Sequence, residues 1–325
     1  MRSGLSLKVL VALALAGPAA AQPATTVVDP IRGLGEVDRT TTTQDIAFRI
    51  DRHDRMTVPV RLGGKGPYRF LVDTGADRTA VSTAVAAELG LSSGPMARLH
   101  SVTGITEVRT ANVPQLELAH NRVRSVEAPL LERVHMGADG ILGVDSLRSQ
   151  RVMFDFKSRV ISIVPSAHRE RETEGTIVVR GKLKRGHLIV TSATANGVPL
   201  TVVLDTGSEM TMGNAALRAR LEARRKLGRP ELIEMTSVTG QKLVGEAFHM
   251  RKVQIGDVVL EDLVIMFSNA PIFNSLDLED RPAVLLGMNA IQAFDKVSID
   301  FARKQMRMVV PERSSVDSAV MALRY

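Results

Sequence analysis

A duplicated segment constrains the fold of this chain more than any other feature. The tripeptide Asp-Thr-Gly occurs at residues 73–75 and again at 205–207, each time directly after an apolar run. After each copy the same landmarks recur in the same order: Ser-Val-Thr-Gly, then two apolar residues and Gly, then Asp-Phe. A repeat in register over this length predicts two similar lobes that differ by small loop insertions.

Short apolar strands bounded by Gly, Pro and Asn dominate both copies of the repeat. This pattern predicts a mainly β fold of two similar lobes related by pseudo-two-fold symmetry, each with a short helix or more, and a groove between them. We expect helices at residues 82–89, with Ser82 as the cap, and at about 215–227. Residues 63–67 are expected to form a tight hairpin turn, because no Gly-Lys-Ser/Thr sequence supports a phosphate-binding loop.

The chain divides into six expected segments. Arg2 and Lys8 precede a short apolar run, and three alanines before Gln22 offer a cleavage site, which is typical of an export signal. An uncleaved anchor is the alternative for this segment, and the residues that follow it read as a spacer or a propeptide. The expected boundaries are an export signal at 1–21, a flexible leader at 22–45, an N-terminal lobe at 46–164, a linker at 165–174, a C-terminal lobe at 175–310 and a tail at 311–325.

Export predicts a periplasmic protein, with secretion or membrane tethering as alternatives. Composition adds further limits. The absence of cysteine excludes disulfides, thiol nucleophiles and thiolate metal sites. The chain has 42 basic and 35 acidic residues, and a run of basic side chains at 217–229 predicts a solvated helix face or, alternatively, a patch for an anionic membrane or acidic protein. Nucleic acid is not expected as a partner, because the chain has few aromatic residues and none interleaves with that run.

Two aspartates on matched loops define the predicted chemistry. Two facing carboxyl groups cannot both ionise cheaply, so the pair holds one proton and can activate a water molecule without a metal. Gly75 and Gly207 allow sharp turns beside Asp73 and Asp205. No cofactor or metal is predicted, because the seven histidines are isolated from one another, and no Gly-x-Ser-x-Gly motif supports a serine hydrolase.

These motifs give the chain a resemblance to a known family. Over residues 46–310 it resembles the retropepsin-like (retroviral-type) aspartic proteases, in the single-chain form with two tandem lobes found in bacterial envelopes. The residues that carry the resemblance are the sequence Asp-Thr-Gly-Ala-Asp-Arg-Thr at 73–79 and the apolar-apolar-Gly runs at 141–143 and 285–287. The resemblance implies an aspartic-type endopeptidase that is active as a monomer on a protein or peptide bound in extended form.

The resemblance also implies roles for individual residues. Asp73 and Asp205 would be the catalytic pair, and Thr74 and Thr206 would interlock the two loops. Gly75, Gly207 and Ser208 would support these loops. The remaining positions would bind substrate, with Asp77 holding the substrate main chain and two flaps closing over it: Asp77, Glu209, Thr103, Gly104, Thr239 and Gly240.

The chain departs from the retroviral pattern at three places. Ser208 and Glu209 stand where the first lobe has Ala76 and Asp77, and we hypothesise that the Ser208 hydroxyl bonds Asp205, favours its ionised form and leaves Asp73 the more readily protonated partner. Neither apolar-apolar-Gly run is followed by Arg, so the usual partner of Asp77 is missing. Neither expected flap contains tyrosine.

Two functions remain open from the sequence. The first is an exported aspartic endopeptidase that acts on an extended segment of a protein substrate. The second is a catalytically silent peptide-binding or regulatory envelope module that has kept the fold. Both aspartates are intact, which favours the enzyme.

Overall fold

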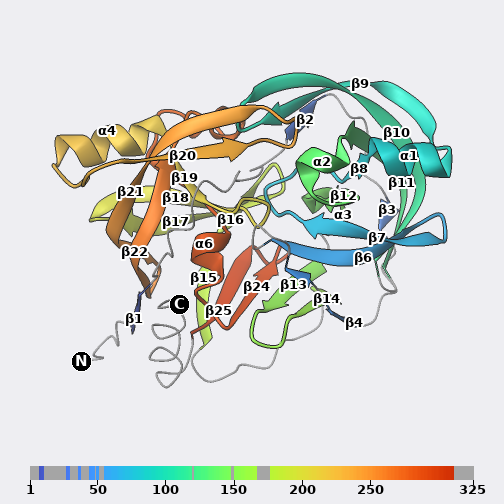
Figure 1. The fold of residues 1–325 in the computed structure, drawn as a ribbon. Helices are drawn as coiled ribbons and strands as arrows, with labels where there is room; N and C mark the ends of the chain where they lie inside the picture. Colours follow the sequence, from blue (N-terminus) through green and yellow to red (C-terminus); the bar gives the residue numbers. More distant parts are fainter. Residues whose placement is uncertain are drawn as a thin grey trace, which may run out of the picture.

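The computed structural model describes residues 55–118, 121–147, 150–166 and 176–310. It also describes the backbone of short strands before residue 55, namely β1 (Leu7–Leu10), β2 (Val27–Asp29), β3 (Glu36–Val37), β4 (Gln44–Ala47) and β5 (Arg49–Ile50). Strands dominate, and they form two sheet-rich lobes with a third sheet below and between them (Figure 1). The prediction of a mainly β, two-lobed protein is therefore confirmed.

The first lobe is one sheet in the order β2-β9-β10-β11-β8-β12-β7-β6-β5. Short helices pack beside β8, β11 and β12, and the hairpin of β9 and β10 arches away from the rest of the lobe (Figure 1). Its other elements are β6 (Met56–Leu62), β7 (Lys65–Val72), β8 (Ala80–Ser82), α1 (Thr83–Leu89), β9 (Ser92–Ser101), β10 (Gly104–Leu118), β11 (Asn121–Leu131), α2 (Arg133–Met136), β12 (Gly140–Leu142) and α3 (Val144–Leu147).

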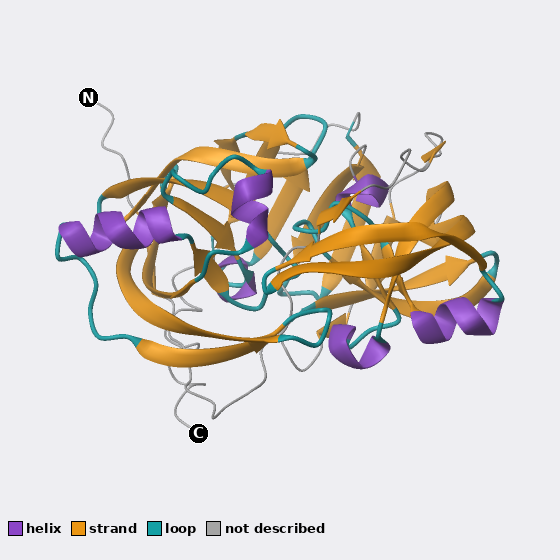
Figure 2. Ribbon diagram, turned by 90° about the horizontal axis from the view of Figure 1, so that it is seen from above, coloured by secondary structure: helices purple, strands orange, loops and turns teal. Residues whose placement is uncertain are grey.

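The second lobe repeats this plan in the order β22-β19-β23-β18-β17-β21-β20, with β16 paired to β17. Figure 2 shows the two lobes side by side, each with a long curved hairpin and a helix at its outer end. Its elements are β16 (Lys182–Lys184), β17 (His187–Ala195), β18 (Val198–Leu204), β19 (Thr211–Gly213), α4 (Ala215–Ala223), β20 (Glu231–Thr236), β21 (Lys242–Ile255), β22 (Val258–Phe267), α5 (Pro271–Ser275), β23 (Ala283–Leu286) and α6 (Met288–Ile291).

A third sheet, which we call the shared sheet, joins the two lobes. Its order is β15-β25-β24-β13-β14-β4, so the closing strands of both repeats lie in one sheet. Strand β13 pairs antiparallel with β24, and Lys296 on β24 binds Asp155 on β13 at 2.7 Å. The bounds are β13 (Gln150–Asp155), β14 (Val160–Pro165), β15 (Thr176–Arg180), β24 (Lys296–Asp300) and β25 (Gln305–Val309).

Local sequence explains most of these elements. In β6, Val58, Val60 and Leu62 are buried while Pro59 and Arg61 are exposed, which is the alternation expected of a strand with one face on the core. Of the turn predicted at residues 63–67, residues 63–64 form a tight turn between β6 and β7, and residues 65–67 already belong to β7.

The two predicted helices form, and one is shorter than expected. The Ser82 hydroxyl accepts a hydrogen bond from Val85 N, so the predicted cap of α1 is confirmed. Helix α4 starts as predicted but ends at Ala223 rather than near residue 227. The backbone of Arg225 has a φ of 52°, which is incompatible with a continuing right-handed helix.

The terminal segments are described only in part. Strand β1 lies within the expected export signal and pairs parallel with β22, and β2 of the expected leader pairs antiparallel with β9. Most of the expected linker and all of the expected tail at 311–325 lie outside the described residues. No helix among the described residues is long and apolar enough to cross a membrane.

Candidate active site

Each Asp-Thr-Gly tripeptide follows an interior strand of its lobe's sheet. Strand β7 leads into Asp73, whose N–H donates to Leu142 O of the parallel strand β12 at 3.0 Å. Strand β18 leads into Asp205, whose N–H donates to Leu286 O of β23 at 3.1 Å. The apolar-apolar-Gly runs of the sequence are therefore the strands that lie beside the two Asp loops and fix where they begin.

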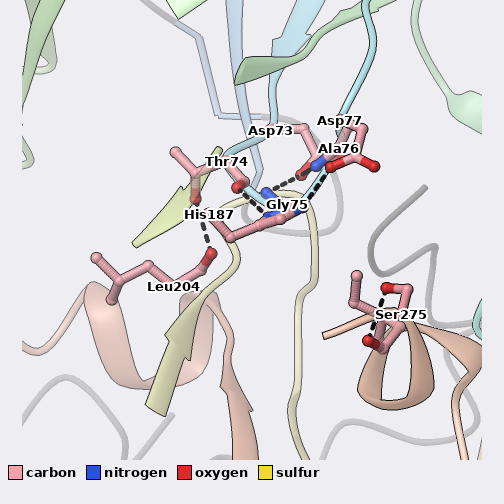
Figure 3. A network of polar contacts seen from close by, with 9 residues as sticks. Asp73, Thr74, Gly75, Ala76, Asp77, His187, Leu204 and Ser275 are labelled. Carbon is pink, nitrogen blue, oxygen red and sulfur yellow. Dashed lines mark hydrogen bonds and ion pairs between the residues drawn. The ribbon is translucent and has the colours of Figure 1, made fainter. Parts of the chain in front are cut away.

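Four hydrogen bonds lock the two loops together across the lobe junction. Thr74 N donates to Thr206 Oγ1 at 3.0 Å, and Thr206 N donates to Thr74 Oγ1 at 3.1 Å. Each hydroxyl then donates to a carbonyl of the opposite lobe: Thr74 to Leu204 O at 3.1 Å, drawn in Figure 3, and Thr206 to Val72 O at 2.7 Å. Because both hydroxyls and both N–H groups are used, the loops have one mutual register.

The two carboxyl groups are held in the same way. Asp73 Oδ1 accepts from the N–H groups of Gly75 and Ala76 at 2.8 and 3.0 Å, as Figure 3 shows. Asp205 Oδ1 accepts from Gly207 and Ser208 N–H, both at 3.1 Å. The side chains are almost fully buried, with Asp73 4% and Asp205 0% exposed.

Asp73 lies directly against the loop that carries Asp205. A β-carbon added to Gly207 would lie 2.2 Å from Asp73 Cγ, so only glycine permits this approach. Burial, and then the charge of Asp205, raise the pKa of Asp73 well above its usual range. The N–H groups of Gly75 and Ala76 and the charge of Arg55 act in the opposite direction but are weaker. A carboxyl group that stays protonated at unusually high pH therefore faces a second carboxyl group.

Comparison with known families agrees with this geometry. The family model described as "Aspartyl protease" matches two regions of the chain, residues 58–146 and 191–290. The chain belongs to the aspartyl protease family. No curated protein sequence matches it. The two matched regions correspond to the two lobes, as the retropepsin-like resemblance predicted, and membership establishes a protease-type function in general, with a peptide as the ligand.

A second pair of matched residues supports the loops of this aspartyl protease. Asp145 Oδ1 accepts from Thr79 N and Thr79 Oγ1 at 3.0 and 2.8 Å, and Asn289 Oδ1 accepts from Thr211 N and Thr211 Oγ1 at 2.9 and 2.7 Å. In each lobe the same threonine hydroxyl also accepts from the glycine N–H after β12 or β23. One lobe thus uses a carboxyl group where the other uses an amide.

This difference gives a prediction about stability. Burial raises the pKa of Asp145, so the folded chain holds the proton of this carboxyl group more tightly than the unfolded chain does. Protonated Asp145 therefore stabilises the fold at low pH, and this stabilisation is lost as pH rises through the raised pKa. We expect Asp145→Asn to be more stable than the wild type at pH 8, with a smaller difference at pH 4, in urea unfolding. The converse variant, Asn289→Asp, should lose stability as pH rises. A difference that does not change with pH would contradict the explanation.

The expected flaps are the tips of two hairpins, β9–β10 and β20–β21, and they meet. Thr103 Oγ1 of the first tip donates to Gln241 Oε1 of the second at 2.8 Å. Val102 belongs to an apolar cluster of the second lobe with Ile189, Met210 and Phe273, while Val238 belongs to a cluster of the first lobe. Gly240 packs on the ring of His135 in α2. Each tip is thus anchored in the opposite lobe.

The hypothesis about the Ser208 hydroxyl is wrong. That hydroxyl donates to Met210 O at 2.8 Å, and only the backbone N–H of Ser208 bonds Asp205. Ala76 N–H bonds Asp73 in the same way, so residue 208 introduces no asymmetry through its hydroxyl. The hydroxyl instead closes the turn that follows the loop.

Asp77 has a partner that the sequence analysis missed. Asp77 Oδ1 lies 2.5 Å from Nε2 of His187, at the start of β17 in the other lobe. The signal was present in the repeat, since His187 stands 132 residues after Arg55, the same interval that separates Asp73 from Asp205. The Glu209 carbonyl oxygen lies beside α6, because Asn289 N donates to it at 3.0 Å.

Two further sequence predictions concern the surface and metals. In the basic stretch at 217–229, Arg218 binds Glu222 at 2.8 Å and Glu246 at 2.5 Å and lies over the ring of Phe248, so this part of α4 is a salt-bridged helix face.

Within the described ranges, no three His, Asp or Glu side chains gather as a metal site would require.

Proposed function

We propose that this chain is an exported aspartic endopeptidase that hydrolyses peptide bonds of protein substrates with a water molecule activated between Asp73 and Asp205. The observation that carries the proposal is the pair of interlocked, buried Asp-Thr-Gly loops, one of whose carboxyl groups has a strongly raised pKa. Two carboxyl groups that share one proton supply an acid and a base at the same time.

The reaction needs no covalent intermediate. The ionised carboxylate, Asp205, takes a proton from water as the water oxygen attacks the carbonyl carbon of the peptide bond, and protonated Asp73 gives its proton to the carbonyl oxygen. The tetrahedral adduct then collapses: the C–N bond breaks, the nitrogen takes a proton from Asp205, and Asp73 recovers a proton from the adduct hydroxyl. Water is consumed, and both aspartates return to their starting state.

The flaps supply the binding surface for an extended peptide. A peptide that lies between the flap tips and the Asp loops can pair its backbone with strand edges and direct alternate side chains to opposite sides of its own strand. Gly104 and Thr239 lie at the same tips as Thr103 and Gly240 and belong to this surface. Asp77 and Glu209, which follow the two loops, would orient the main chain.

Two parts of the proposal concern the state of the protein. Both Asp loops come from one chain and lock onto each other, which supports a monomer as the active unit. Residues 1–21, with their basic start and short apolar run, support export, with the periplasm as the proposed location.

The test is to search for new peptide termini. The purified protein starting at Gln22, and its Asp205→Asn variant, are incubated with an envelope-protein extract between pH 4 and pH 8, and termini are identified by mass spectrometry. We expect internal termini with the wild type only, most abundant at acidic pH, where one proton is shared by the pair. Termini at chain ends alone would replace the endopeptidase with an exopeptidase.

The alternative is a silent peptide-binding module. It would be supported if the wild type released no peptides at any pH but still retained extended peptides, because binding requires the flaps and not the shared proton. If cleavage appears only after residues 22–45 are removed, the protein is instead a zymogen.

A further inference from the structure

His187 is a buried histidine beside the first Asp loop. It begins β17 in the second lobe, its side chain is 0% exposed, and it reaches across to the loop of the first lobe. Its Nδ1 lies 3.2 Å from Thr74 O, and its Nε2 lies 2.5 Å from Asp77 Oδ1. Figure 3 shows the ring under the segment from Thr74 to Asp77. Asp73 immediately precedes this segment, so the ring supports the loop that places one proposed catalytic carboxyl group.

The hydrogen-bond partners define the charge state of the ring. Thr74 O is a carbonyl oxygen and can only accept, so Nδ1 carries a hydrogen. Asp77 Oδ1 accepts when ionised, so Nε2 must carry a hydrogen as well. A ring with both hydrogens is an imidazolium. Loss of the Nε2 hydrogen would turn a charge-assisted bond into a contact between two lone pairs in a buried site.

The repeat shows that the other lobe uses a different residue at this position. Arg55 precedes β6 as His187 opens β17, and it is also fully buried. Arg55 donates to Met136 O at 2.8 Å, and its charge lowers the pKa of Asp73. Arginine keeps its charge at every physiological pH, whereas histidine changes its charge between about pH 5 and 8. The two halves of the junction therefore differ in whether the residue at this position is of a type that can lose its charge.

Lys184, Asp145 and Asp73, three charged residues near His187, bond to other groups. On β16, Lys184 pairs with His187 in register, but its Nζ binds Leu276 O and Asp277, both at 2.6 Å. The following turn packs Gly186 on Val144 of α3, and the neighbouring Asp145 is held by Thr79 and Ser146. On the Asp loop itself, Asp73 bonds its own loop N–H groups. Among the described residues, Asp77 is thus the charged group that bonds the His187 ring.

We propose that His187 is a positioning residue that holds the Asp73 loop only while both of its ring nitrogens are protonated, and that it thereby confines full peptidase activity to acidic pH. The inference rests on the proposed function. In the acidic state the imidazolium joins the two lobes through Thr74 and Asp77. In the deprotonated state one of these two bonds is lost, and the loop that carries Asp73 is free to shift, which lowers catalysis because misplacement by about 1 Å can cost about 100-fold.

The first experiment compares kcat/KM of the wild type, His187→Arg and His187→Gln at each pH from 4.5 to 8.5. Ratios of variant to wild type at one pH cancel the titration of Asp73 and Asp205 themselves. We expect the His187→Arg ratio to rise at least about tenfold from pH 5 to pH 8, because the guanidinium stays charged. We expect His187→Gln to be about 10- to 100-fold less active than the wild type at pH 5 and closer to it at pH 8. Ratios that do not change with pH would overturn the proposal.

The matched control is His249, an exposed histidine on β21 that also faces carboxylates, with Nδ1 2.9 Å from Asp262 Oδ1. His249→Gln is expected to leave the pH profile unchanged. A pH-dependent ratio in this control equal to that of the His187 variants would assign the effect to histidine charge in general and overturn the proposal.

A second measurement does not depend on activity or on the folding of the arginine variant. In nitrogen-15 spectra of the full chain labelled at histidine, both His187 ring nitrogens should carry protons at pH 5, and Asp77→Asn should remove this signature. One protonated nitrogen at pH 5 would overturn the inference. If the spectra show the doubly protonated ring but no cleavage occurs, the proposed function fails while the charged contact stands.

Discussion

Replacing Asp205 with asparagine is expected to lower kcat/KM for peptide hydrolysis by about 10²- to 10⁴-fold while the fold is retained. Asparagine keeps the size of the side chain and can still accept the Gly207 and Ser208 N–H bonds through its amide oxygen, but it cannot take a proton from water. The measurement is kcat/KM on a peptide identified from the cleavage experiment, with circular dichroism to verify the fold.

The same substitution at Asp73 has a second expected effect. Because burial and the Asp205 charge raise the pKa of Asp73, the folded protein holds its proton more tightly than the unfolded chain, so stability falls as pH rises through the raised pKa. Asp73→Asn should therefore inactivate the protein but stabilise it at pH 8, with a smaller gain at pH 4. Asp280→Asn, at an exposed loop, is the control and should change neither quantity.

Two results for Asp73→Asn would contradict this prediction. An Asp73→Asn variant that is equally active would place the acid elsewhere and remove Asp73 from the mechanism. An inactive variant without any gain in stability at pH 8 would mean that Asp73 ionises freely in the folded chain, and the shared proton would then have to reside on Asp205.

The repeat in the sequence predicted the centre of the molecule well. Two Asp-Thr-Gly tripeptides after apolar strands were sufficient to predict matched loops, and Thr74 and Thr206 form the interlock that the family resemblance implied. The cap of α1 at Ser82 could also be predicted, because helix capping depends on a few neighbouring residues. Local signals predict local structure.

Contacts between residues that lie far apart in the sequence could not be predicted from the sequence in the same way. His187 meets Asp77 across 110 residues, and only the pairing of lobes brings them together. The antiparallel pairing of β13 with β24 in the shared sheet is a similar case, because alternation identifies a strand but not its partner. The hypothesis that the Ser208 hydroxyl bonds Asp205 failed for a related reason. A serine hydroxyl can rotate toward several nearby acceptors, and here it donates to the carbonyl oxygen of Met210, two residues along the chain.

Loss of the Thr206 hydroxyl is expected to be the most destabilising single change at the lobe junction. Thr206→Val keeps the shape of the side chain but leaves Thr74 N without an acceptor and Val72 O without a donor, both in a buried site. Each buried polar group left unsatisfied costs about 1–3 kcal/mol, so we expect a loss of about 2–5 kcal/mol in the free energy of unfolding, measured in urea. Thr206→Ser retains the hydroxyl and should lose far less.

The counterpart Thr74→Val separates the interlock from simple burial. Each hydroxyl accepts from the other residue's N–H, so either substitution disturbs bonds of both loops. The double variant should therefore be less destabilised than the sum of the two single variants, because residues in one hydrogen-bond network are not additive. Additive effects would show that the two hydroxyls act independently, and the loops would then owe their register to the strands beside them, β12 and β23, rather than to the threonines.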